Sequence, residues 1–134
     1  MAIHTRRDAV LTTTKACPAA GANHNTATLD LKSTTAGAFA DSVEVEIVIP
    51  ALPSLADGKT LTVKLQDSAD NSSYTDIPEL AAFVVTGVST NGSAAATRTV
   101  RLPSTTKRYL QANLAVATGG GDNTDKSVTV SLLC

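Results

Sequence analysis

Aromatic residues make up only 3% of this 134-residue sequence, and tryptophan is absent. Hydrophobic residues nevertheless reach 43%, so the core must consist mainly of valine, leucine, isoleucine and alanine. Aliphatic and β-branched side chains pack well on a pleated surface. A chain of this length buries roughly two-thirds of its unfolded surface without help from a disulfide or a metal. The composition therefore favours a single all-β domain.

Clustered charge of one sign is also missing. Eleven Lys and Arg residues against twelve Asp and Glu residues give a formal net charge of −1. The basic residues group no more densely than pairs such as Lys107-Arg108. Because nucleic-acid binders neutralise phosphates with clustered Lys and Arg, we expect no nucleic-acid partner.

Long apolar runs are absent as well. No run of seven apolar residues follows Arg6-Arg7, so a signal peptide is not indicated, and no stretch is long enough to cross a bilayer. We therefore expect a soluble protein made in the cytosol, with no membrane partner. There the two cysteines, Cys17 and Cys134, should be free thiols, although the terminal Cys134 could also be reactive or couple to another subunit.

Residues 1–25 show no sustained period of 2 or 3.6 and contain both histidines, His4 and His24. A segment with so little to bury predicts an extended N-terminal arm, with the folded domain spanning residues 26–134. A short helical turn over Asp8–Leu11 is a weaker alternative.

From Thr26 onward, apolar and polar residues alternate with the period of a half-buried strand. Turn-forming residues separate the alternating segments. About seven or eight antiparallel strands in a two-sheet sandwich are expected, either jelly-roll-like or immunoglobulin-like. The missing Cys, Trp and Cys signature favours the jelly roll. The expected strands begin around Leu29 and Leu31 and continue over residues 43–49, 61–65, 83–88, 97–102, 109–117 and 127–133.

Two motifs contain residue types that could bind a ligand. Gly58-Lys59-Thr60 resembles the end of a phosphate-binding loop, but Pro53 stands where the first glycine is needed and a strand pattern follows. The residues Asp67, Asp70, Asn71 and Asp76 offer oxygen ligands for calcium, without EF-hand spacing. A polar hairpin turn, in which Asp and Asn bind their own backbone, is the better interpretation.

Catalytic signatures are equally sparse. Glu44 and Glu46 fall on the outward face of one strand, as expected for a solvated surface rather than a glycosidase pair. No Ser-His-Asp arrangement or zinc-ligand spacing can be placed on the expected strands. We expect no enzyme activity, no cofactor and no metal.

The segment Val63–Ile77 resembles a hairpin of tailed-phage virion proteins, in which a strand ends in Asp-Ser-x-Asp and is followed by an aromatic residue and Thr-Asp-Ile. The likeness continues through Leu102–Val116 and through the glycine-rich loop and final strand, Gly119–Leu132. Together these segments resemble the capsid cement (decoration) proteins of Bordetella-phage-like podoviruses. The resemblance covers roughly residues 40–134, and none of its motifs is catalytic.

This resemblance implies a jelly-roll-like structural virion protein, often a homodimer, made in the bacterial cytoplasm. It would bind the outer capsid surface across junctions between major capsid protein subunits. We hypothesise that residues 1–25 become ordered on the capsid. The glycine-rich loop either becomes ordered against a partner or simply connects two strands. An edge strand is also expected to pair with the same strand of a second copy or with a capsid strand. The candidate contact residues are His4, Arg6, Arg7, Asp8, Lys15, Gly119, Gly120 and Gly121.

An alternative is a carbohydrate- or receptor-binding sandwich from a phage tail fibre or spike. Sugar sites usually present aromatic platforms, and this chain has only Phe39, Tyr74, Phe83 and Tyr109. That scarcity favours the cement interpretation. A hydrolase on a β scaffold is the third and weakest alternative.

Overall fold

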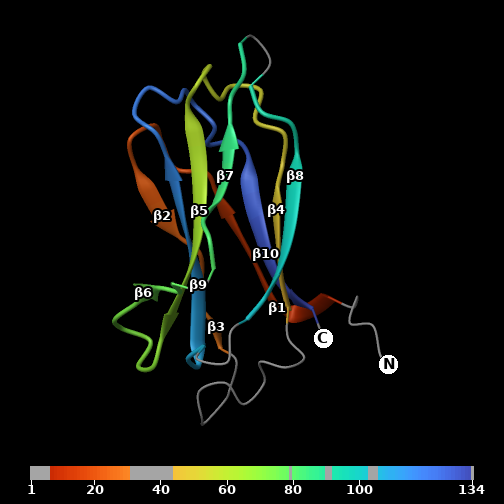
Figure 1. The fold of residues 1–134 in the computed structure, drawn as a ribbon, viewed down its shortest axis with the longest axis vertical. Coiled ribbons are helices and arrows are strands. Elements are labelled where there is room, and N and C mark those ends of the chain that lie inside the picture. The colour runs from red at the N-terminus through yellow and green to blue at the C-terminus, as the bar shows by residue number, and fades with distance from the viewer. Residues whose placement is uncertain (1–6, 31–43, 79, 90–91, 103–105, 134) are drawn as a thin grey trace.

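The computed structural model describes residues 7–30, 44–78, 80–89, 92–102 and 106–133 (Figure 1). These residues form strands, with no helix and therefore no helix that spans a membrane. In chain order the strands are β1 (Arg7–Ala16), β2 (Asn23–Asn25), β3 (Leu29–Asp30), β4 (Glu44–Ile49), β5 (Thr60–Ser68), β6 (Thr75–Asp76), β7 (Phe83–Thr86), β8 (Ala96–Arg101), β9 (Tyr109–Val116) and β10 (Ser127–Leu133).

The strands form two antiparallel sheets that face each other (Figure 1). Sheet A has the order β1-β10-β4-β8, and sheet B has the order β2-β9-β5-β6, with β3 also on β9 and β7 also on β5. If β2 and β3 are counted as one edge strand, and β6 and β7 as another, eight strands remain, and these can be numbered from one to eight along the chain. In this numbering sheet A has the order 1-8-3-6 and sheet B the order 2-7-4-5. The first strand pairs with the eighth, the second with the seventh, the third with the sixth and the fourth with the fifth, as in one long hairpin that is rolled into a sandwich. The predicted jelly-roll sandwich is therefore confirmed.

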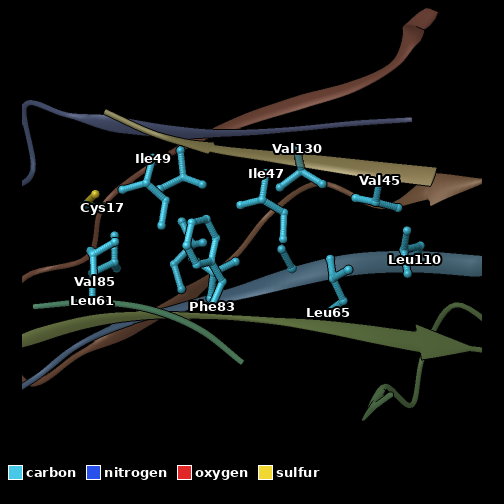
Figure 2. Packing of buried hydrophobic residues seen from close by; sticks show 14 of the residues in the cluster. Cys17, Val45, Ile47, Ile49, Leu61, Leu65, Phe83, Val85, Leu110 and Val130 are labelled. Atoms are coloured by element: carbon cyan, nitrogen blue, oxygen red, sulfur yellow. The ribbon is translucent and has the colours of Figure 1, made fainter. Parts of the chain in front are cut away.

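Alternation along each strand explains why these segments form sheets. In β4 the side chains of Val45, Ile47 and Ile49 are buried, and the residues between them are half-buried on the outer face. Antiparallel pairing with β8 and β10 aligns the buried sets, because residues directly opposite point to the same face. Figure 2 shows side chains of the two sheets meeting in one core, among them Ile47, Ile49 and Val130 from sheet A and Leu61, Leu65 and Leu110 from sheet B.

The prediction of an arm separate from the folded domain is wrong for residues 7–25. Strand β1 pairs with β10 over Thr12–Ala16, and β2 pairs with β9. Cys17, between them, is fully buried in the core, and its backbone N–H donates to Lys126 O at 2.9 Å. The weaker alternative of a helical turn over Asp8–Leu11 is also wrong, because these residues belong to β1. The segment is extended, but its backbone forms hydrogen bonds with β10 of sheet A and with β9 of sheet B.

Candidate interaction surfaces

The structure describes only some of the candidate contact residues near the N-terminus. His4 and Arg6 lie outside the described residues. Arg7 lies opposite Leu133 in the β1–β10 pair, and Asp8 follows within a register shift of β1; the side chains of both lie outside the described part. Lys15 is half-buried on β1, opposite the buried Val128.

The glycine loop is held by its own chain. Gly120 is buried, its N–H donates to Ala117 O at 2.9 Å, and its carbonyl accepts from Ala56 N at 3.2 Å and from Asn123 Nδ2 at 3.1 Å. Gly119 and Gly121 are exposed and have positive φ. The connecting-loop interpretation accounts for this geometry, and Gly120 does not reach the surface.

The loops at this end of the sandwich touch one another through their backbones. A Cβ on Gly121 would lie 2.3 Å from Ser54 O, and a Cβ on Gly92 would lie 1.9 Å from Leu52 O. Leu52 and Ser93 also exchange backbone hydrogen bonds of 2.9 and 3.0 Å. We call these loops, residues 17–22, 50–59, 87–89 with 92–95, and 117–126, the glycine end. No side chain fits where these backbones meet.

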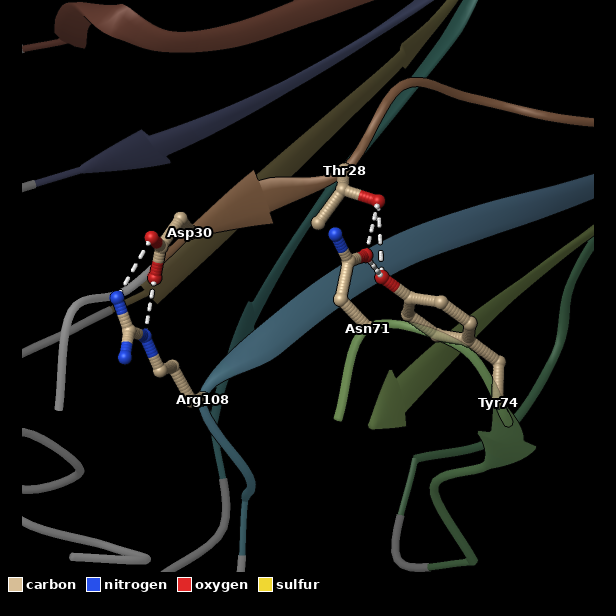
Figure 3. Close-up of polar contacts among 5 residues, drawn as sticks. All are labelled: Thr28, Asp30, Asn71, Tyr74 and Arg108. Carbon is tan, nitrogen blue, oxygen red and sulfur yellow. Dashed lines mark hydrogen bonds and ion pairs between the residues drawn. The ribbon is translucent and has the colours of Figure 1, made fainter. Parts of the chain in front are cut away.

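The opposite end of the sandwich is fastened by side chains. Arg108 donates from Nε to Asp30 Oδ1 at 2.8 Å and from a terminal nitrogen to Asp30 Oδ2 at 3.0 Å (Figure 3). This two-point pair joins β3 to the start of β9, and it raises the pKa of Arg108. Nearby, Asp67 Oδ2 accepts from the backbone N–H of Lys107 at 3.1 Å.

A second fastening joins the β5–β6 turn to the residue before β3. The hydroxyls of Thr28 and Tyr74 lie 2.8 Å apart, and each is within hydrogen-bond distance of the carboxamide oxygen of Asn71 (Figure 3). Their two protons serve two of these three contacts at a time. Asn71 has a φ of 60°, a conformation that Asn tolerates better than most residues. We call this cluster and the Asp30–Arg108 pair the clasped end.

The acidic residues weighed for calcium serve separate structural roles. Asp70 Oδ1 accepts from the backbone N–H of Ser72 at 2.9 Å and of Ser73 at 3.0 Å. These bonds, with one from the Ser68 hydroxyl, lower the pKa of Asp70 to about 2. Asp67 and Asp76 bind other partners, and no metal-ligating group occurs among the described residues. The hairpin-turn interpretation is confirmed for Asp70.

The thiol of Cys17 is free and shielded. Burial, with a smaller contribution from Asp125, raises the pKa of Cys17. Because the thiolate is the reactive form, this thiol has a structural role in the core. Cys134 lies outside the described residues.

Both outer strands of sheet A direct a basic residue toward the core side. Lys15 of β1 lies opposite Val128 of β10, and Arg98 of β8 lies opposite Ile47 of β4. The Arg98 guanidinium stacks 4.8 Å from the centroid of the Phe83 ring and donates to Ala81 O and Ala82 O at 3.4 and 3.3 Å. Inward-pointing charges are a known way to block an edge strand from pairing with another chain.

The edges of sheet B are interrupted instead. On one side β2 and β3 are separated by residues 26–28, and on the other β6 and β7 are separated along β5. Short edge strands also resist pairing. The hypothesis that an edge strand adds a strand from a partner therefore has little geometric support.

Sequence reasoning missed a row of side-chain amides on the outer face of sheet B. Asn113 on β9 donates from Nδ2 to Asn25 Oδ1 at 2.8 Å and to Asn23 Oδ1 at 3.3 Å. Beside them, Gln111 Nε2 donates to Gln66 Oε1 at 2.8 Å. We call these five residues the amide strip. The polar positions between Leu110, Ala112 and Leu114 were the available signal, but β2 had not been recognised as their neighbour.

Comparison with known proteins identifies a family match. A protein-family model described as Bbp16 matches residues 11–130. This span contains strands β2 to β9 in full, β1 from residue 11 onward and β10 up to residue 130. No curated protein matches the chain.

Proposed function

The chain belongs to the Bbp16 family of phage proteins, and on this ground we propose that it is a structural virion protein that cements the capsid. In this role it binds the outer surface of the assembled head and stabilises contacts between major capsid protein subunits, after synthesis in the host bacterial cytoplasm. The observation that carries the proposal is the family match, which spans nearly the whole sandwich. The resemblance of Val63–Ile77 and Leu102–Val116 to cement proteins narrows the role.

The geometry supports a contact through faces or loops. Lys15 and Arg98 occupy the two edges of sheet A, and the edges of sheet B are short. A domain with blocked edges stays discrete at high copy number, as a decoration protein must before it meets a head. Among the described residues, two large apolar side chains are also exposed, Val84 at 47% and Val88 at 55%.

The thermodynamics of cementing require no strong single contact. A protein that binds the assembled lattice, but not loose subunits, stabilises the lattice by mass action. A copy that touches two subunits gains further from effective concentration. We propose that the protein acts as a homodimer, with one patch used twice about a twofold axis.

A non-catalytic role fits the acidic residues and the thiol described above. Asp67 and Asp70 fasten backbone N–H groups, and Cys17 is buried. We propose no cofactor, no nucleic-acid partner and no membrane partner.

The test is co-sedimentation of the purified protein with expanded, undecorated phage heads, together with the thermal stability of those heads. Saturable binding and a raised head-melting temperature are the expected results. If the folded protein fails to sediment with heads, the cement proposal is wrong and the tail-fibre or spike module takes its place. Sedimentation equilibrium of the free protein tests the homodimer.

The N-terminal contact residues need a narrower truncation than residues 1–25. Removing residues 1–25 would delete β1, β2 and the buried Cys17, so a loss of binding would only report unfolding. Removing residues 1–6, which include His4 and Arg6, keeps every described strand. We expect this variant to keep the unfolding midpoint of the full chain and to bind heads more weakly. Undiminished binding would exclude His4 and Arg6 as contacts.

A further inference from the structure

The amide strip on sheet B has the chemistry of a site for neutral carbohydrate, and we infer that it binds a glycan chain. It comprises Asn23 and Asn25 on β2, Gln111 and Asn113 on β9, and Gln66 on β5. These three strands are neighbours in one sheet (Figure 1). The inference does not depend on the cement role, since it concerns a face whose residues were not among the predicted capsid contacts.

The hydrogen bonds within the strip leave a defined pattern for a ligand. Each carboxamide has two N–H donors and one oxygen acceptor. Asn113 donates both of its side-chain N–H groups, one to the oxygen of Asn23 and one to the oxygen of Asn25. This leaves the oxygen of Asn113 and the NH2 groups of Asn23 and Asn25, which no described residue of the chain binds. The strip therefore offers one acceptor and two donors to a ligand.

Hydroxyl groups complement this pattern. A hydroxyl both donates and accepts, so neighbouring hydroxyls of a sugar ring can bind an amide NH2 and an amide oxygen together. Asn23 and Asn25 are two residues apart on one strand, so their side chains repeat at roughly 6.6 Å along the face. Asn25 lies opposite Asn113, and Asn113 lies opposite Lys64. The free groups thus lie on β2 and β9, with Lys64 of β5 next to them, and Gln111 is buried beside them.

The charge and rigidity of the face also favour a neutral sugar. Lys64 beside the strip faces Asp76, with 3.9 Å between Nζ and Oδ2, and Asp76 accepts from Gln66 Nε2 at 2.8 Å. The charge of Lys64 is thus matched by that of Asp76, which belongs to the same hydrogen-bond network. Because Gln66, Gln111 and Asn113 are already oriented by hydrogen bonds, binding orders few side chains and costs little entropy.

A protein partner fits this strip less well. The centres of protein interfaces are enriched in aromatic, Met and Arg side chains, which bury apolar area. The strip contains only carboxamides, so covering it with apolar groups would leave polar atoms unpaired. A ligand must return these hydrogen bonds, and a polyhydroxylated chain does so along its whole length.

The experiment is a titration of the ¹⁵N-labelled full-length protein with cellohexaose, maltohexaose and mannohexaose, followed by NMR. Each sugar is taken to about 10 mM, a range that detects weak binding. We expect at least one sugar to shift the side-chain NH2 signals of Asn23, Asn25 and Asn113 saturably. Asn113→Ala should weaken that binding about tenfold, equivalent to about 1.4 kcal/mol.

Two further variants guard the interpretation. Asn25→Ala changes only the exposed edge strand β2, so it should retain the fold and still weaken binding. Thr97→Ala changes the outer face of sheet A and should leave binding unchanged. If none of the three sugars shifts these signals, or if the shifts lie elsewhere, the inference is overturned. If Asn113→Ala abolishes head binding while no sugar binds, the strip is a capsid contact instead.

Discussion

The two ends of this sandwich are stabilised by different means. At the glycine end, Gly92, Gly120 and Gly121 let backbones meet and bond to one another. At the clasped end, Asp30 with Arg108 and Thr28 with Tyr74 tie the strands through side chains. The first arrangement tolerates no added atoms, and the second depends on particular functional groups. We therefore expect the glycine end to be sensitive to steric change, and the clasped end to solvent conditions.

The largest effect is expected for Gly121→Ala. Its Cβ would lie 2.3 Å from Ser54 O, and its φ is +83°. Two loops must separate to admit the methyl group, so we expect a loss of about 3 kcal/mol or more in the free energy of unfolding. Denaturant unfolding measures this loss.

Gly58→Ala is the matched control for that variant. Gly58 has a similar φ of +74°, but nothing lies within 4 Å of a Cβ there. Only the left-handed conformation is penalised, at about 1–2 kcal/mol. Equal losses for the two glycines would show that backbone contact is not what stabilises this end.

A smaller loss is expected for Tyr74→Phe at the clasped end. The substitution keeps the ring and removes the hydroxyl that contacts Thr28 and Asn71, at a cost of about 1 kcal/mol. Tyr109→Phe is the control, because the Tyr109 hydroxyl has no hydrogen-bond partner among the described residues. If both substitutions have the same effect on thermal unfolding, the Tyr74 cluster does not stabilise the clasped end.

Asp30→Asn should cost less still, and the cost should depend on salt. The pair is partly solvent-exposed, at 42% for the Arg108 side chain and 34% for the Asp30 side chain, and solvent-accessible ion pairs are screened by salt. We expect the difference between variant and parent to shrink when thermal unfolding is repeated at high ionic strength. A difference that stays constant with salt would argue that the two hydrogen bonds matter more than the charges.

The smallest effect is expected for Asp70→Asn, and the difference between variant and parent should be present at neutral pH and disappear in acid. The pKa of Asp70 lies near 2, below its ordinary value of 3.8, because Ser68, Ser72 and Ser73 donate to the carboxylate. A lowered pKa contributes stability above about pH 4, and this contribution is lost as the pH falls toward 2. The parent should therefore lose more stability than the variant across that window. Carboxyl NMR that places the pKa of Asp70 at its ordinary value would contradict this prediction.

Much of the fold could be predicted from the sequence. Long strands with strict alternation were located closely, and the predicted span 127–133 is the span of β10. Shorter strands were missed because two or three residues, as in β6 or β2, carry no detectable period. Strand β1 was missed for another reason. Its Thr-rich sequence places Thr13 and Lys15 toward the core side, so the polar residues conceal the alternation.

The surfaces were harder to predict than the core. The glycines at 119–121 were identified as special, but only the structure shows that they approach Ser54 and Ala56 from a distant loop. The amide strip joins residues about 90 positions apart, such as Asn23 and Asn113. Such partners become visible only once the strand order is known.

The pairing of the first and last strands also sets how this domain bears mechanical load. Arg7 lies opposite Leu133, and Ala16 lies opposite Ser127. The first residue of β1 and the last residue of β10 therefore lie side by side at the same end of sheet A. A force applied through the chain ends would peel β1 from β10, breaking their hydrogen bonds one after another. A force that enters through loops at opposite ends of the sandwich would instead shear several strands at once. This domain is therefore mechanically weakest when it is held by its termini.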